Sequence, residues 1–203
     1  WDNGAIVDAG AVTWGNGATG TMGAVSAANS LVGSTDLDQV GVFGIAVLTN
    51  DNYVVRSALW NNGAAAAAGA ATWVNGANGN IAGSASPGGV VSTANSLVGS
   101  TANDQIGSNV SPLSNGNYVT YSSAWNNGTT VNVGAVTWVN GTNGIAAGET
   151  TPGAVVSVTN SLVGSTASDL VGQQVTVLVE GPSKSAEKHG HAEPPDTRHP
   201  TPD

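Results

Sequence analysis

Short runs of apolar residues alternate with clusters of Gly, Asn, Ser and Thr along most of the chain. Four such runs follow one another at residues 106–113, 117–121, 133–139 and 155–163. Each run is rich in Val, Thr or an aromatic residue and is bounded by turn-forming residues, a pattern typical of β-strands. The connections are too short for crossover helices, so we predict that the four strands form an antiparallel meander.

Two local signals refine this prediction. The pair Asn115-Gly116 precedes the second run and predicts a two-residue hairpin turn in which both residues have positive φ. The strongest helical signal is the alanine run at residues 64–68, but it is short and bracketed by glycines. Its counterpart at residues 129–133 has the sequence of a strand or a loop, so we expect no helix.

The same pattern of strands and turns is repeated along the chain. A corner motif begins at Trp1, Trp60 and Trp125, and these landmarks are 59 and 65 residues apart. A Thr-Trp pair and an Asn-Ser-Leu-Val-Gly-Ser-Thr block follow in the same order within each copy. The first copy lacks about seven residues that correspond to the neighbourhood of Ser86-Pro87-Gly88. A length change in a Gly/Pro segment predicts a surface loop there.

The repeats divide the chain into a β-domain and a tail. We expect the β-domain at residues 1–178, made of a partial unit (1–39), two whole units (40–105 and 106–170) and the first strand of a further unit (171–178). Residues 179–203 hold five of the eight prolines and all three histidines. A tail of this composition buries too little apolar surface to fold, so we expect it to be disordered or extended. Because the chain begins inside a repeat, we expect it to be part of a longer protein.

Ala and Val supply most of the 40% of residues that are hydrophobic, beside 29 Gly, one Phe and one Met. We therefore expect a thin core between closely packed strands. Trp14, Trp73 and Trp138 on the third strand of each copy are expected to fill the remaining gaps in this core.

The charge pattern excludes several classes of partner. Charged residues make up only 8% of the chain, against about 25% in ordinary soluble domains. Arg56 is the single basic residue in residues 1–178, which hold eight carboxylates. We expect no nucleic-acid binding, because that needs a basic face. Cysteine is absent, and no apolar run reaches 18 residues, so we expect no membrane span.

A four-stranded meander repeated every 60 residues or so is typical of a β-propeller, or of a stacked β-solenoid or β-sandwich array. The residues Gly107, Val110, Leu113, 115–119 and 134–136 resemble an integrin-type propeller blade, with its phenylalanine-glycine and glycine-alanine-proline landmarks. The resemblance implies a β-propeller-like fold.

The Asn-Ser-Leu-Val-Gly-Ser-Thr block and residues 52–55 carry a second resemblance, which covers residues 1–178. They resemble a repeat of unknown function found in tandem in large bacterial surface proteins of the filamentous-haemagglutinin type. This resemblance implies an extracellular or cell-surface protein. Integrin-type blades bind calcium through several Asp residues, but the matching loops at 49–52 and 114–117 hold only Asp51. We therefore expect no metal site there.

The corner residues are the best candidates for ligand binding. Trp60 and Trp125, with Asn62 and Asn127 beside them, have the residue types of a glycan-binding platform, in which a sugar stacks on an exposed indole. The competing interpretation is that these indoles fill the space between sheets made of Ala and Val.

The carboxylates and histidines do not form a catalytic group. Asp38, Asp104 and Asp169 each follow the Gly-Ser-Thr block by a few residues, where a carboxylate closes a turn by accepting backbone hydrogen bonds. His189 and His191 lie in the tail, where no fixed metal geometry is expected. We find no catalytic residues and expect no enzyme activity and no cofactor.

Counting strands gives the functional expectation. The chain holds fewer than three complete units, too few to close a propeller, so open strand edges remain at both ends. We expect an extracellular structural or adhesive repeat protein that associates with itself into a ring, filament or surface coat. The alternative is a carbohydrate-binding module that uses the corner Trp residues.

Overall fold

The computed structural model describes residues 1–173, which form twelve β-strands and no helix. This confirms the predicted all-β class. The strands are β1 (Ala11–Thr13), β2 (Ser30–Val32), β3 (Ile45–Val47), β4 (Tyr53–Ser57), β5 (Ala70–Val74), β6 (Gly89–Val90), β7 (Leu97–Val98), β8 (Asn109–Pro112), β9 (Tyr118–Ser122), β10 (Ala135–Val139), β11 (Ala154–Val155) and β12 (Leu162–Val163).

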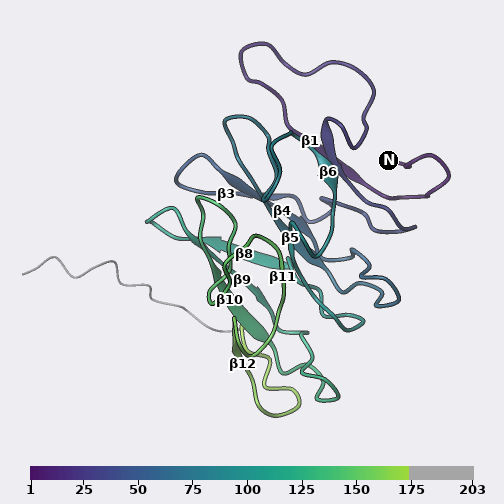
Figure 1. The fold of residues 1–203 in the computed structure, drawn as a ribbon. Helices are drawn as coiled ribbons and strands as arrows, with labels where there is room; N and C mark the ends of the chain where they lie inside the picture. The colour runs from purple at the N-terminus through teal and green to yellow at the C-terminus, as the bar shows by residue number, and fades with distance from the viewer. Residues whose placement is uncertain (174–203) are drawn as a thin grey trace, which may run out of the picture.

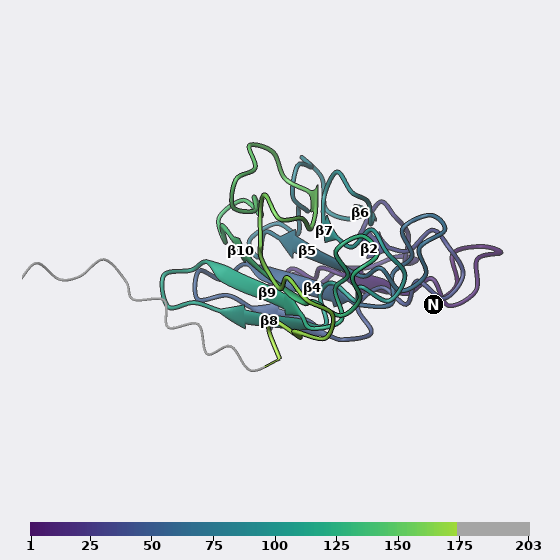
Figure 2. The same cartoon turned by 90° about the horizontal axis from the view of Figure 1, so that it is seen from below.

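The strands build three sheets that are stacked face to face in chain order (Figure 1). The first sheet has the order β1-β2-β6, the second β11-β7-β5-β4-β3 and the third β12-β10-β9-β8. The view from below shows the same succession (Figure 2). Within residues 1–173 the sheets form an open stack, and neither a closed barrel nor a closed propeller ring is present.

Two apolar layers hold the stack together. Leu31 of the first sheet packs with Val55 of the second in one layer, and Val54 of the second sheet packs with Val139 of the third in the other. Neighbouring residues of a strand point to opposite faces, so Val54 and Val55 serve different layers. The centre of the second sheet is therefore buried on both faces, and all five residues of β5 are buried.

Two of the four predicted strands match closely. Residues 117–121 and 133–139 correspond to β9 and β10, which pair antiparallel. The run at 106–113 is shorter, since only β8 is extended.

The prediction of a single strand at residues 155–163 is wrong. This segment contributes β11 to the second sheet and β12 to the third. The break is caused by Asn160, whose side chain accepts from the Ser157 backbone and donates to the Val155 carbonyl, which closes a turn.

The prediction of a purely antiparallel meander is also corrected. β11 pairs parallel with β7 of the preceding copy, and β6 pairs parallel with β2 in the same way. The Gly/Pro segment that precedes these strands is thus more than a surface loop, because it leads each copy back onto the sheet of the copy before it.

The hairpin at Asn115-Gly116 forms with a longer loop than expected. Leu113 donates its backbone N–H to Asn117 at 2.8 Å, which leaves three residues in the loop. Gly116 has φ of 86°, whereas Asn115 does not adopt positive φ. Three-residue hairpin loops place a single residue, usually glycine, in the left-handed region.

The last part of the chain is only partly covered. Val171 forms a parallel bridge with Gly134. The remaining residues of the predicted strand at 171–178 and the predicted tail at 179–203 lie outside the described residues. Among the described residues no helix is long and apolar enough to cross a bilayer.

Non-glycine residues adopt left-handed conformations at the same three places in each copy. They are Asp8, Ala67 and Asn132, then Leu37, Asn103 and Ser168, and finally Gln39, Gln105 and Leu170. Each such residue costs about 1–2 kcal/mol because its Cβ crowds the backbone. The repetition shows that the corner geometry is required by the stack.

The corner strain gives a first prediction. Ala67 has φ of 51°, so Ala67→Gly removes a strained Cβ. We expect the free energy of unfolding to rise by about 0.5–1 kcal/mol, after the entropy that glycine adds to the unfolded chain. Ala64→Gly in the same corner is the control, since Ala64 has no positive φ, and it should lower stability. Urea unfolding measures both, and equal effects would contradict the strain argument.

Candidate interaction surfaces between copies and at the ends of the stack

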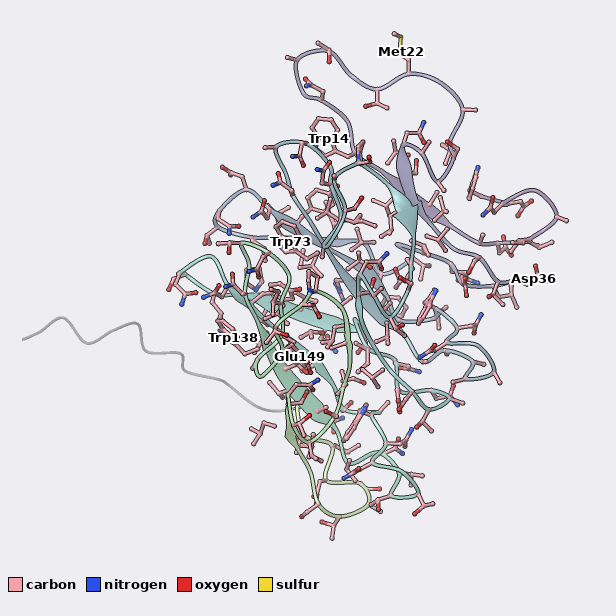
Figure 3. The ribbon with its side chains drawn as sticks, viewed as in Figure 1. Trp14, Met22, Asp36, Trp73, Trp138 and Glu149 are labelled. Carbon is pink, nitrogen blue, oxygen red and sulfur yellow. The ribbon has the colours of Figure 1, made fainter. Side chains whose placement is uncertain are left out.

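The third-strand Trp of the first two copies forms a joint with the next copy. The indole Nε1 of Trp14 donates to the carbonyl of Gly76, and that of Trp73 donates to the carbonyl of Gly141, both at 2.8 Å. Figure 3 shows Trp14, Trp73 and Trp138 in sequence along the stack. The predicted core role of these Trp residues is thus confirmed for Trp73, which is buried.

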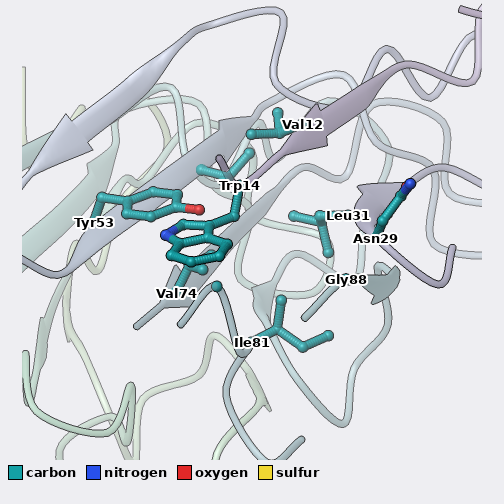
Figure 4. A pocket seen from close by; sticks show the side chains of 10 residues that line it. Val12, Trp14, Asn29, Leu31, Tyr53, Val74, Ile81 and Gly88 are labelled. Carbon is teal, nitrogen blue, oxygen red and sulfur yellow. The ribbon is translucent and has the colours of Figure 1, made fainter. Parts of the chain in front are cut away.

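Glycine is required where the next copy covers the ring. A Cβ added to Gly144 would lie 2.8 Å from the Cβ of Trp73. The equivalent glycine in the second copy, Gly79, lies against Trp14 in the same way. Figure 4 shows Trp14 in the narrow junction between the first two sheets. The space left there is about 10 Å³, at most the size of one water molecule.

The carbonyl of Gly141 is a meeting point for several donors. Besides the Trp73 indole, it accepts from the amide nitrogens of Asn50 and Asn52, each at 2.9 Å. The donors come from the second sheet and its hairpin, and the acceptor belongs to the next copy. A single carbonyl therefore locks the hairpin, the Trp and the following copy together.

A carboxylate forms a second joint between copies. Oδ2 of Asp104 accepts from the backbone of Ser100 and Thr101 at 2.9 and 2.8 Å. Oδ1 accepts from the backbone and the side chain of Asn126 in the next copy, at 3.0 and 2.9 Å. Asp38 repeats this arrangement with Asn61.

The predicted turn-closing role of these carboxylates is confirmed, but the sequence reasoning missed their second partner. The available signal was that an Asp after the Gly-Ser-Thr block and an Asn after the next corner Trp recur together around Asp38 and Asp104. Sequence spacing alone could not show that the two residues touch.

The corner residues do not form the expected glycan platform. Trp60 and Trp125 are only 5% and 3% exposed, so neither ring offers a face on which a sugar could stack. Both indole Nε1 atoms are buried without a hydrogen-bond partner among the described residues. Asn62 donates to the Gly99 carbonyl at 2.8 Å and thereby ties its corner to β7, whereas Asn127 is exposed.

Among residues 1–173, no segment covers the outer face of the third sheet in the way that the third copy covers the second sheet. Trp138 is 37% exposed, against 6% for Trp73, and Leu162 is 65% exposed, against 5% for Leu97. Together with Val119 they line an open groove of about 390 Å³. The same side chains that are core in the second copy are surface in the third.

The opposite end of the stack is uncovered in a matching way. Trp1 and Val25 are exposed, although their counterparts in the second copy, Trp60 and Val91, are buried. A shallow hollow of about 450 Å³ lies beside Trp1. Each end thus exposes positions that are buried where two successive copies meet.

Among residues 1–173 there is no cluster of three or more His, Cys, Asp or Glu residues that could hold a metal ion. The histidines named in the sequence analysis lie outside the described residues. Several of the described polar side chains, such as Asp104 and Asn52, instead connect one copy to the next.

These features define the class: a tandem-repeat, all-β protein in which each copy is completed by its neighbour. The chain belongs to the family described as a repeat of unknown function (DUF5650), which matches residues 1–42, 47–108 and 112–173. No curated protein and no solved structure was found to match the chain.

The Trp joint gives a second prediction. In Gly144→Ala the new Cβ would press on Trp73 in a backbone with φ of 74°. We therefore expect the free energy of unfolding to fall by roughly 3 kcal/mol. Gly20→Ala is the control, because Gly20 has φ of 71° and no atom within 4 Å of the added Cβ. Gly20→Ala should lower the free energy of unfolding by only about 1 kcal/mol, because it adds backbone strain and no clash. Equal losses in thermal unfolding would show that the close approach is unimportant.

The carboxylate joint gives a third prediction. Asp104→Asn places an amide N–H₂ against donors, so we expect a loss of roughly 2–4 kcal/mol in unfolding free energy. Asp169→Asn changes the same turn in the last copy, where no Asn of a following copy is bound, and should shift the urea midpoint much less. If both variants lost the same stability, the link between copies would contribute nothing.

Proposed function

We propose that this protein is an extracellular structural or adhesive repeat protein that joins further copies of the same repeat through the exposed face at an end of its stack. The observation that supports this most directly is the contrast between Trp73, buried in the middle of the stack, and Trp138, exposed at its end. The face that carries this Trp is buried where another copy follows it, so the same face is suited to bind another copy where it is exposed.

The stack also fits a structural role because it can grow by addition. Each copy adds one sheet and one parallel edge strand to the sheet before it, as in repeat arrays whose stability is a sum over neighbours. Such growth favours a filament or a coat over a compact globule. An origin among large bacterial surface proteins of the filamentous-haemagglutinin type is part of this proposal.

The charge distribution supports association through neutral contacts. Arg56 is the one Lys or Arg side chain in residues 1–173, and its guanidinium donates to the carbonyls of Gly107 and Ser108 in the following unit. The surface is otherwise polar and mostly uncharged, so its contacts depend little on ionic strength. The corner residues Trp60 and Trp125 give no comparable support to a glycan-binding function, because both rings are buried.

Surface labelling tests the proposed location. An antibody raised against residues 1–173 should label intact source cells, and protease treatment of those cells should remove the label. A cytoplasmic marker should stay unlabelled in the same preparation. Labelling that appears only after permeabilisation would contradict the proposal.

A further inference from the structure

We propose that the outer face of the third sheet is a docking site for a complete copy of this repeat carried by another chain, and that the first copy of this chain is excluded as its occupant. The inference rests on the proposed function and names the partner and the contacts. The same joint, closed twice within the chain, shows what the occupant must supply.

The apolar part of the site is the groove beside Trp138. Val136 and Leu162, which line it, occupy the places of Ala71 and Leu97 in the second sheet. There the corresponding surface is covered by the third copy, whose Gly144 lies on the Trp73 ring. The occupant of the groove must therefore bring a glycine that can lie flat on an indole.

The polar part of the site is already in its docked arrangement. Oδ1 of Asn117 accepts from Gly141 at 3.0 Å, as Oδ1 of Asn52 accepts from Gly76 at 3.1 Å. In the second sheet the amide nitrogen of Asn52 then donates to the Gly141 carbonyl. By the same geometry, Asn117 and the Trp138 indole provide two donors for the carbonyl of an incoming Asn-Gly loop.

The carboxylate of Asp169 completes the site. Its Oδ2 accepts from the backbone of Ser165 and Thr166 at 2.7 and 2.8 Å, so the turn is formed without a following copy. Its Oδ1 accepts from the Thr166 hydroxyl at 2.6 Å. In Asp38 and Asp104 the same oxygen accepts a hydrogen bond from the side chain of an Asn in the next copy.

An occupant thus needs three features that the second and third copies share. It needs an Asn-Gly loop with a further glycine for the indole, as in residues 75–79, and a glycine in the place of Gly88. It also needs an Asn in the place of Asn61. Gly88 is required because a Cβ there would lie 2.5 Å from the backbone nitrogen of Ser30.

The first copy has only the first of these features. Its loop is folded like the docking loops, with Gly20 donating to the Asn16 carbonyl at 2.6 Å, and nothing covers Gly20. Met22, however, stands where Gly88 is needed, and about seven residues are missing beside it. Met22 is almost fully exposed and points outward on its loop (Figure 3).

The corner of the first copy is also unsuited to docking. Asp2 stands in the place of Asn61. One oxygen of Asp2 accepts from Asp8, as Oδ1 of Asn61 accepts from Ala67, so the other oxygen takes the place of the amide nitrogen. Docking would bring this carboxylate against that of Asp169, and two like charges in such a contact repel each other.

The test restores the missing features of the first copy in the 203-residue chain. In the completed variant, Asp2→Asn is combined with replacement of residues 21–24 by residues 80–90 of the second copy. Light scattering coupled to size exclusion should give the wild type the mass of one chain at every concentration. The mass of the completed variant should increase with concentration to about twice that of one chain or more. Its head-to-tail contact does not close into a ring, so further chains can add.

Matched substitutions in the completed variant locate the contact. Trp138→Ala and, separately, Leu162→Asn should return the mass to that of one chain. Leu162→Asn guards against misfolding, since this side chain is mostly exposed. Val131→Asn is the control and should leave the association unchanged, because Val131 is exposed and its counterpart Ala66 stays exposed in the middle of the stack.

Three results would overturn the proposal. The first is a completed variant that stays a monomer while its circular dichroism and melting match the wild type, as expected if another segment of the chain covers the groove. The second is association that neither groove substitution reduces. The third is a wild type that associates through Trp138, since the first copy would then be a sufficient occupant. The surface labelling described above is independent of all three.

Discussion

The structure depends on one constraint: a sheet of small residues that is apolar on both faces can be buried only between two neighbours. Val54 and Val55 follow one another in β4, point to opposite faces, and are both fully buried. With side chains this small, a single sheet gains too little apolar burial to offset the entropy of ordering its chain. Each copy is therefore stabilised by its neighbours, and at an end of the array the side chains that would be core are exposed.

Close approach is the second half of this constraint, and it explains the glycine content. The Gly141 carbonyl accepts from three donors of the preceding unit, and a Cβ on Gly141 would lie 1.7 Å from the Gly116 carbonyl oxygen of its own unit and 3.1 Å from Leu48 of the preceding one. Polar backbone groups buried between sheets need partners, and here Asn side chains and Trp indoles supply them. The Asn-rich composition thus serves the hydrogen bonding of the joints as well as the solvent surface.

The sequence predicted what local chemistry controls and missed what the neighbouring copy controls. The strands around Tyr118 and Trp138 follow from β-propensity, and the turn at Asp104 follows from the spacing of its carboxylate. The split of residues 155–163 between two sheets could not be predicted, because two-residue strands carry no periodicity. Trp60 was misleading for a related reason: Asn beside Trp suggests a sugar site, but here Asn61 binds Asp38 of the preceding unit.

The carboxylate turns show how a copy can be ready for its neighbour before the neighbour is present. The Thr166 hydroxyl, followed by the backbone N–H groups of Thr166 and Ser165, lowers the pKa of the Asp169 carboxyl. A lowered pKa means that the turn is favoured at pH above the value of the unfolded chain and weakens as pH falls through the folded value. The hydrogen bonds of this turn lie within its own copy, and a turn that is already formed reduces the entropy lost when a further copy binds. Preorganised turns of this kind allow a small number of hydrogen bonds to join one repeat to the next.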